Sequence, residues 1–500
     1  MSVFLDRRRE MAMLDARYRG EHAEFVVIYG RRRVGKSELI DRFLDGRNGV
    51  RLLAREESKV LQLRKFAQEL GDFFRDPFLK STGFAGWDSF FEYLLQHSDR
   101  RTVIAIDEFP YLVKEDPALP SILQEYWDRH LKDSSLYLIL CGSSIAMMEA
   151  TTMDHASPLF GRRTAQILLR PLRFVHVLDY LRDLRTAVEF YSVFGGTPAY
   201  VMAADPGKDV LANVEEKVLA EDSFLFRDVD FVLRTELTEP RYYLSILSSI
   251  SQGNHAIGLI CNDTGLSKSI VGKYLSVLID LRLVHRRIPV TESAKSRKGL
   301  YYLSDNLFDF WFTFVGPNLE ALERGNSRLV AEQFVEPRLA AYVGRHFEGI
   351  VADLFDLFND HALLPFVYAR IGTWWYRGDE IDIVCLRDDE RTVLFCEVKW
   401  QDAVDAVAVL ERLEEKAPRV AWHNDRRDES FCVVARSFSR RPPADGRTLC
   451  LDLDDLAAWV ARAGEGNAPG ACNARQETRP EGHERDAGGR DGSAPHRGKR

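Results

Sequence analysis

Residues 24–37 read EFVVIYGRRRVGKS, an apolar stretch that runs directly into a loop rich in glycine and arginine. The run from 25 to 29 has the continuous apolar character of a buried parallel strand. Gly30 and Gly35 permit backbone conformations that other residues resist, so the loop can turn successive N–H groups toward phosphate oxygens. Lys36 then reaches the β- and γ-phosphates, and the Ser37 hydroxyl ligates Mg²⁺ where a helix begins. The stretch predicts a strand, a phosphate loop and a helix, with nucleotide-binding residues Gly30, Arg31, Arg32, Arg33, Val34, Gly35, Lys36, Ser37 and Glu38.

An acidic pair follows a second apolar strand. Residues 103–106 read VIAI and end in Asp107-Glu108. In a nucleotide site Asp107 holds Mg²⁺, directly or through water, and Glu108 polarises the water that attacks the γ-phosphate. An acidic pair after a strand is most often an ordinary solvated turn. Beside a phosphate loop, however, the pair indicates hydrolysis, with Glu108 and Lys36 as the predicted catalytic residues.

Two features farther along the chain each leave two interpretations open. The strand predicted over 136–140 ends in Cys-Gly followed by Ser143 and Ser144. A small polar residue there can sense the γ-phosphate, but a serine that caps the next helix predicts the same letters. Arg162 and Arg163 can supply a cation to the developing phosphate charge, or they can be solvated surface arginines.

The motifs of the first 200 residues resemble a known family. They read FLDRRREMAML, GRRRVGKS, AIDEFPYL, CGSSIAMME, PLFGRRTAQILLRPL and GGTPAYV. In this order they are similar to the archaeal-type ATPases of the AAA+/STAND division, which also occur in bacteria. The resemblance implies an additional-strand P-loop fold, an α/β architecture with a parallel sheet, and ATP as the nucleotide. It also implies an adenine pocket built partly by Phe4 and Arg7.

Residues 239–303 predict a winged helix-turn-helix of the α+β class. A turn over 264–267 separates two helical patterns, Ser267 caps the second, and residues 283–290 and 299–303 pair as a wing. Between 241 and 300 there are nine Lys and Arg residues against three Asp and Glu. Such cations neutralise DNA phosphates, so DNA is a predicted partner. The alternative is a winged helix that serves only as a lid or an oligomer contact. The predicted DNA-binding residues are Lys268, Lys273, Arg286 and Arg287.

The region 336–455 carries a second candidate site. Asp382 lies in a predicted strand, and fifteen residues later Glu397 and Lys399 share one face of the next strand. Two carboxylates and a lysine can ligate Mg²⁺ and activate a water for phosphodiester attack, and Glu348 can add a third carboxylate. The pattern resembles the restriction-endonuclease-like PD-(D/E)xK nucleases, an α/β fold. It predicts catalytic Asp382, Glu397 and Lys399, with Asp382 and Glu397 as metal ligands. Two amphipathic strands with a surface Glu/Lys pair would look the same, no proline precedes Asp382, and Glu380 beside it leaves the metal carboxylate open.

The composition of the chain limits which other classes of protein it can belong to. The chain has 500 residues, is 45% hydrophobic and 29% charged, and carries a net charge of −8. No apolar run approaches the roughly 20 residues that span a bilayer. The seven cysteines form no C-x-x-C pair, and the N-terminus has no signal-peptide pattern, so we expect a cytoplasmic protein. The predicted parts are an ATPase domain with a helical extension (1–238), the winged helix (239–303), an aromatic connector (304–335), the nuclease-like domain (336–460) and a disordered tail (461–500).

Three functions remain open from the sequence. The first is a DNA-associated switch that binds ATP and Mg²⁺, hydrolyses ATP and positions a nuclease-like module. The second is a regulator that binds DNA or a partner protein, with an inactive nuclease-like scaffold. The third is ATP-driven assembly, into a homo-oligomer for example, with both downstream modules as protein contacts.

Overall fold

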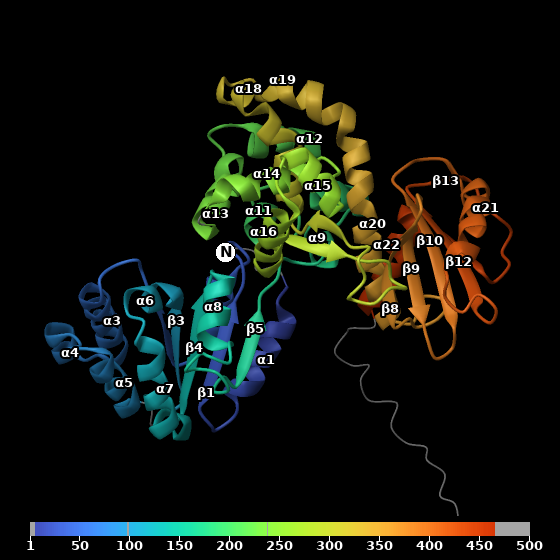
Figure 1. Cartoon of the computed structure of the whole chain (residues 1–500). Coiled ribbons are helices and arrows are strands. Elements are labelled where there is room, and N and C mark those ends of the chain that lie inside the picture. The colour runs from blue at the N-terminus through green and yellow to red at the C-terminus, as the bar shows by residue number, and fades with distance from the viewer. Residues whose placement is uncertain (1–5, 98–99, 238, 466–500) are drawn as a thin grey trace, which may run out of the picture.

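The ATPase domain is built on a five-stranded parallel sheet. The computed structural model describes residues 6–97, 100–237 and 239–465. The strand order is β2-β3-β4-β1-β5, and every neighbouring pair is parallel. Strand β4 therefore lies between the strand that precedes the phosphate loop and the strand that ends in Asp107, and Figure 1 shows helices on both faces of the sheet. The strands are β1 (Glu24–Tyr29), β2 (Gly49–Leu53), β3 (Thr102–Asp107), β4 (Leu136–Gly142) and β5 (Ala165–Leu168).

The burial of these strands explains their apolar sequences. All residues of β3 and β4 are buried, and so is β1 after Glu24. A strand covered by helices on both faces is apolar along its whole length. The expectation of a parallel-sheet P-loop fold is confirmed. The helices are α1 (Arg8–Tyr18), α2 (Lys36–Leu44), α3 (Lys59–Phe74), α4 (Pro77–Thr82), α5 (Trp87–Gln96), α6 (Phe109–Glu115), α7 (Leu119–Arg129) and α8 (Ile145–Thr152).

A helical body follows the ATPase sheet and contains the winged helix. Its helix-turn-helix consists of α15 (Ile257–Thr264) and α16 (Lys268–Asp280), and its wing is the antiparallel pair β6 (Val284–Arg287) and β7 (Leu300–Leu303). The Ser267 hydroxyl accepts a hydrogen bond from the Ile270 amide and caps α16, as predicted. The other helices of the body are α9 (Phe174–Leu181), α10 (Leu184–Phe194), α11 (Pro198–Val201), α12 (Val210–Asn213), α13 (Phe224–Glu236), α14 (Pro240–Ser251), α17 (Asn306–Phe310), α18 (Leu319–Glu323) and α19 (Ser327–Val330).

One hydrophobic core runs through this helical body. Buried residues of α10, α13, the winged helix and α17 belong to the same cluster. The Trp311 indole, just after α17, donates a hydrogen bond to the Phe226 carbonyl in α13. The predicted boundaries after residues 238 and 303 stay predictions, but this core crosses both. Ile270 of α16 stays outside this core and is 40% exposed.

Helix α20 (Glu336–Asp360) connects the helical body to a C-terminal mixed sheet of order β14-β12-β10-β9-β8. Strands β8, β9 and β10 are antiparallel neighbours, whereas β10, β12 and β14 are parallel. Helices α20 and α22 cover one face and α21 covers the other. The elements are β8 (Arg370–Tyr376), β9 (Asp379–Arg387), β10 (Thr392–Lys399), β11 (Val404–Asp405), α21 (Ala406–Lys416), β12 (Asp428–Ala435), β13 (Phe438–Arg440), β14 (Thr448–Leu451) and α22 (Leu453–Glu465).

The end of the described chain corrects one expectation. Residues 461–465 were assigned to a disordered tail, but they complete α22, whose amphipathic sequence packs against α20 and the sheet. The rest of the predicted tail, 466–500, lies outside the described residues, as does Phe4. Within the described ranges, no helix combines the length and apolar character needed to cross a membrane.

Candidate functional site

The phosphate loop joins β1 to α2, and its first glycine is required by a close approach. A Cβ at Gly30 would lie 2.3 Å from the carbonyl oxygen of Leu169, a distance that no side chain tolerates. Gly35 has a φ of 89°, in the left-handed region that favours glycine. The loop ends at the N-terminus of α2, where unsatisfied amides favour negative charge.

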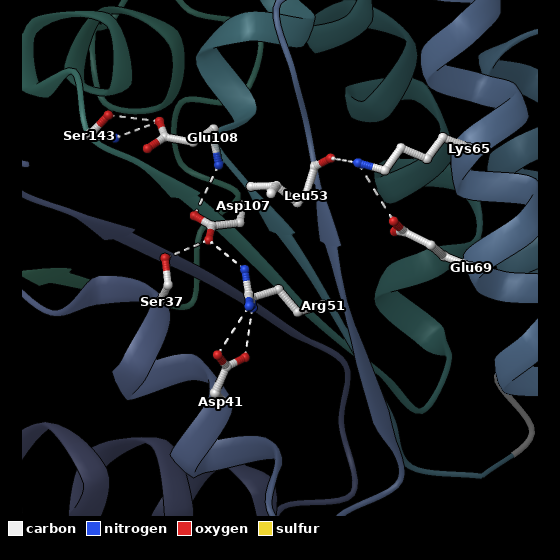
Figure 2. Close-up of polar contacts among 9 residues, drawn as sticks. All are labelled: Ser37, Asp41, Arg51, Leu53, Lys65, Glu69, Asp107, Glu108 and Ser143. Atoms are coloured by element: carbon white, nitrogen blue, oxygen red, sulfur yellow. Dashed lines mark hydrogen bonds and ion pairs between the residues drawn. The ribbon is translucent and has the colours of Figure 1, made fainter. Parts of the chain in front are cut away.

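Lys36 and Ser37 lie where the sequence placed them. Lys36 is buried, and its ammonium donates to the carbonyls of Gly30 and Arg31, both at 2.9 Å. The Ser37 hydroxyl donates to the Asp107 carboxylate at 2.7 Å (Figure 2). The structure therefore brings the two predicted metal ligands together from β3 and α2.

Arg51 is a member of this site that sequence reasoning missed. Its guanidinium lies 3.2 Å from the Asp107 carboxylate and binds Asp41 through two nitrogens, at 2.6 and 3.0 Å. Burial alone would lower the pKa of Arg51, but Asp41 and Asp107 outweigh it and raise that pKa. Arg51 lies next to Asp107 only because β2 pairs with β3, so no local sequence motif predicts that it belongs to this site.

Glu108 is held by the end of β4. Its backbone is left-handed, with a φ of 56°, and one carboxylate oxygen accepts hydrogen bonds from the Ser143 amide at 3.1 Å and hydroxyl at 2.8 Å. Of the two interpretations of this strand end, the geometry favours contact with the site. The residue before α8 is Ser144, and its side chain makes no capping hydrogen bond. Ser143 therefore orients the predicted catalytic carboxylate.

The three loop arginines contact protein groups, and two of them pair with aspartates of the helical body. Arg31 pairs with Asp305 at 3.2 Å, and Arg33 pairs with Asp228 at 2.6 Å. The Arg32 guanidinium donates to the Tyr111 hydroxyl at 3.4 Å. Their side chains thus contact protein partners, while the loop amides remain the groups predicted to bind phosphate.

Both aspartate partners are buried and hydrogen-bonded. Asp228 and Asp305 are 2% and 5% exposed. The Tyr200 hydroxyl donates to Asp228 at 2.7 Å, and the Thr197 hydroxyl donates to Asp305 at 3.2 Å. Asp305 also caps α17. The phosphate loop therefore lies at the interface between the ATPase sheet and the helical body.

The remaining candidates near the nucleotide site have structural contacts. Arg162 makes a bidentate contact with Asp128, at 2.7 to 3.1 Å, and Arg163 donates to Gln166 at 2.7 Å. These contacts agree with the interpretation of Arg162 and Arg163 as surface arginines. Arg7 is buried and donates to the carbonyls of Val34 and Arg170, so it holds the phosphate loop.

The C-terminal candidates also converge. The Lys399 ammonium lies 2.7 Å from Glu397 and 3.3 Å from Asp382. Asp382 also accepts a hydrogen bond from the Val398 amide at 2.8 Å. Sequence reasoning missed Lys416 of α21, whose ammonium lies 2.7 Å from the second oxygen of Glu397. Two carboxylates and two lysines thus share one end of β9 and β10.

Burial and neighbouring charges shift the pKa values of Asp382 and Glu397 in opposite directions. Burial, and then the charge of Glu397, raise the pKa of Asp382 to about 6. Burial also acts to raise the pKa of Glu397, but Lys399 and Lys416 outweigh it and lower that pKa. Burial and the nearby Asp382 raise the pKa of Glu348 to about 8. Among the described residues, no three His, Cys, Asp or Glu side chains gather as a metal-binding group.

The pairing of β8 with β9 is irregular next to Asp382. Gly372 of β8 pairs with Val384, whereas Trp374 pairs with Ile381, so β9 has one extra residue in this interval. Such bulges redirect side chains and occur beside active sites. Simple alternation along a strand does not reveal this irregularity.

The winged helix exposes part of its predicted DNA surface. Lys268 and Lys273 are exposed on α16. Arg286 is exposed and donates to the carbonyls of Ala294 and Ser296 within the wing. Arg287, one residue later, turns to the other side and lies 4.3 Å from the Tyr302 ring. The wing therefore presents its two arginines on opposite faces.

Comparison with known proteins supplies the family. Residues 4–203 match an ATPase domain predominantly from Archaea, and residues 244–286 match bacterial regulatory proteins of the arsR family. Residues 311–415 match archaeal and bacterial proteins of unknown function. An uncharacterized protein of Methanocaldococcus jannaschii is 33% identical over 460 residues, which cover 91% of this chain and 100% of the relative. The chain belongs to this family of archaeal-type ATPases.

Solved structures are similar to part of this archaeal-type ATPase. A Walker-type ATPase of Pyrococcus abyssi is 18% identical, with a TM-score of 0.47, over 62% of this chain and 96% of that one. The ORC2 protein of Aeropyrum pernix, in ADPNP–ADP complexes, is 14% identical, with a TM-score of 0.41, over 65% and 96%. The STAND and PD-(D/E)xK assignments stay predictions.

Proposed function

We propose that this archaeal-type ATPase is a DNA-associated switch that binds and hydrolyses ATP. The 2.7 Å contact between Ser37 and Asp107 carries the ATPase part, because it joins the phosphate loop to the acidic end of β3. A hydroxyl and a carboxylate are oxygen ligands of the kind that Mg²⁺ prefers, so these residues fit the ion. Lys36 and the loop amides then hold the phosphates, and bound Mg²⁺ would neutralise charge on them.

Glu108 is the proposed base. Both hydrogen bonds from Ser143 go to the same oxygen, Oε2, which leaves Oε1 to accept a proton from the attacking water. Arg51 orients Asp107 through its ion pair. We expect Lys36→Ala to abolish ATP turnover in a phosphate-release assay with Mg²⁺. Full turnover by this variant would contradict the proposal.

The ion pairs of the loop arginines support the switch. Arg31 and Arg33 belong to the same loop as the phosphate-binding amides, and their partners Asp305 and Asp228 belong to the body that contains the winged helix. A rearrangement of the loop around phosphate therefore acts directly on that body. The match of residues 244–286 to arsR-family regulators and the exposed side chains of Lys268 and Lys273 support DNA as the partner.

A second candidate function is Mg²⁺-dependent nucleic-acid cleavage by the C-terminal domain. The observation that favours it is the convergence of Asp382, Glu397 and Lys399 at one end of β9 and β10. We expect Asp382→Ala to abolish any cleavage of DNA while ATP turnover continues. DNA that stays intact beside a sequence-specific footprint would instead favour a DNA-binding regulator with an inactive scaffold.

A further inference from the structure

A cavity joins the wing of the helix-turn-helix to the candidate nuclease centre. Its volume is about 310 Å³. One wall comes from the wing, a second from α20, and a third from β8 and β9, so residues far apart in the sequence meet around it. The lining residues used below are Arg287 of the wing, Glu348 and Gly349 of α20, Thr373 of β8 and Asp382 of β9.

The wing contributes an oriented cation. The Arg287 guanidinium lies 4.3 Å from the Tyr302 ring centroid, and its Nε donates to His285 at 3.1 Å. In the ranges that the structure describes, Arg287 forms no ion pair with a carboxylate. Stacking therefore fixes the direction of a guanidinium whose charge is available to a ligand, and guanidinium geometry suits phosphate.

The opposite wall contributes carboxylates. Glu348 has no hydrogen-bond or ion-pair partner among the described residues, although it lies within electrostatic range of Asp382 and Arg287. Asp382 extends the wall to the candidate nuclease centre through its contact with Lys399. A cation on one side and two carboxylates on the other fit a phosphate group with a divalent cation between it and the carboxylates.

The wing is docked, which limits what can enter. The Val290 amide donates to the Thr373 carbonyl at 3.0 Å, and the Arg370 guanidinium donates to the Val290 carbonyl at 2.9 Å. A Cβ at Gly372 would lie 3.2 Å from the Val290 Cβ, so β8 packs closely against the Val290 side chain of the wing. A cavity of this volume is at the small end of ligand sites, which span roughly 300 to 1,000 Å³. It has room for one nucleotide and none for a duplex.

We propose that this cavity binds a single unpaired nucleotide of a DNA strand, whose phosphate contacts Arg287. The inference rests on the second candidate function above and names its substrate class: strand ends or unpaired segments beside a duplex held by the winged helix. If cleavage occurs there, water adds to phosphorus, one P–O ester bond breaks, and the departing oxygen takes up a proton.

The test compares two fluorescein-labelled duplexes of the same sequence, one blunt and one with a short unpaired end. Their affinities are measured by anisotropy with the full-length protein and Ca²⁺. We expect the wild type to bind the unpaired end about tenfold more tightly, as a charge-assisted phosphate contact allows. Arg287→Ala should bring the ratio of the two affinities close to one. The control variant Arg324→Ala, at an exposed position of the same helical body, should leave that ratio unchanged.

A second variant fills the cavity without changing any charge. A Cβ at Gly349 would meet no atom within 4 Å, so a side chain can start there without a clash. We expect Gly349→Trp to remove the preference for the unpaired end, whereas Gly349→Ala should keep it. Equal wild-type affinity for both duplexes, or a preference that survives Arg287→Ala and Gly349→Trp, would overturn the proposal.

Cleavage with Mg²⁺ separates this inference from the function on which it rests. A preference that depends on Arg287 without any cleavage would support the cavity as a binding site and reject the nuclease. Cleavage of blunt duplex that is indifferent to Gly349→Trp would support the nuclease and reject the cavity as its substrate site.

Discussion

At the scale of single residues, the nucleotide site depends on partners that hold its charged groups. Ser143 hydrogen-bonds Glu108, and Arg51 hydrogen-bonds Asp107. Arg51 lies on β2 and Ser143 directly follows β4, and these two strands are the neighbours of β3, so the acidic pair is oriented from both sides. Preorganised groups of this kind lower the reorganisation needed for reaction.

Glu108→Gln should separate binding from hydrolysis. Glutamine keeps the size of the side chain and an oxygen for Ser143, but it cannot accept a proton. We expect ATP turnover to fall by about 10² to 10⁴, while nucleotide affinity in calorimetry stays within about twofold of the wild type. Turnover at the wild-type rate would show that Glu108 is not the base.

At the scale of elements, α16 and the wing divide their cations between two surfaces. Lys268 and Lys273 are exposed on α16, whereas Arg287 faces the cavity beside α20. A surface that neutralises phosphates releases counterions, so its contribution is read from the salt dependence of binding.

The double variant Lys268→Ala/Lys273→Ala should flatten that dependence. If both lysines contact phosphates, the slope of log K against log salt should become less steep by about 2. Binding to duplex DNA is measured by anisotropy over a salt series. Arg324→Ala, on an exposed helix surface of the same body, is the control and should keep the wild-type slope. A slope unchanged in the lysine variant would point to a winged helix that serves only protein contacts.

His285 makes the wing sensitive to acid. Burial, and then the charge of Arg287, lower the pKa of His285 to about 4. The unfolded chain therefore binds a proton more readily than the folded one between about pH 6.5 and 4. The contribution of His285 to the free energy of unfolding is fully present above about pH 6.5. It is lost as the pH falls toward 4, and the loss from this group is at most roughly 3 kcal/mol.

Urea unfolding at pH 8, 6, 5 and 4 tests this expectation. His285→Gln keeps an acceptor for Arg287 but cannot be protonated. We expect the variant to lose less free energy of unfolding between pH 8 and pH 4 than the wild type does. Parallel curves for the two proteins would mean that His285 does not contribute.

At the scale of the whole molecule, one loop belongs to the predicted nucleotide site and also contacts the helical body that contains the winged helix. Figure 1 shows the helical body between the ATPase sheet and the C-terminal sheet. Arg31 and Arg33 reach into this body from the phosphate loop, and the wing reaches the C-terminal domain through Val290. Contacts therefore run from the phosphate loop to the helical body, and from the wing of that body to the C-terminal domain.

A double-mutant cycle on Arg31 and Asp305 measures the first of these contacts. Asparagine at 305 can still cap α17, so Asp305→Asn removes mainly the charge. We expect a coupling energy of about 1 to 3 kcal/mol between Arg31→Ala and Asp305→Asn in urea unfolding. The exposed pair Arg324 and Glu320 is the control and should couple by less than about 0.5 kcal/mol.

The same variants test the switch. If nucleotide binding and the Arg31–Asp305 pair are coupled, breaking the pair must change nucleotide affinity, because linkage is reciprocal. We expect Asp305→Asn to shift the affinity for ATP in calorimetry, although Asp305 is not a predicted phosphate ligand. An unchanged affinity would mean that the pair is only structural.

The sequence by itself determined the features in which local pattern and chemistry agree. The buried run before Gly30, the glycines of the loop, Lys36 and the acidic end of β3 all follow from residues a few positions apart. The same holds for Ser267 as the cap of α16 and for the spacing of Glu397 and Lys399. Each of these features is defined within a single strand, a single turn or one turn of a helix.

Only the tertiary structure decided which distant groups meet. Arg51 lies beside Asp107 through strand pairing, and Arg31 reaches Asp305 across 274 positions of the chain. The bulge at Asp382 depends on how β8 pairs with β9, and the position of Arg287 in a shared cavity depends on how β8 docks against the wing. Such contacts arise from the packing of whole elements, and packing leaves no periodic signal in the residues that it brings together.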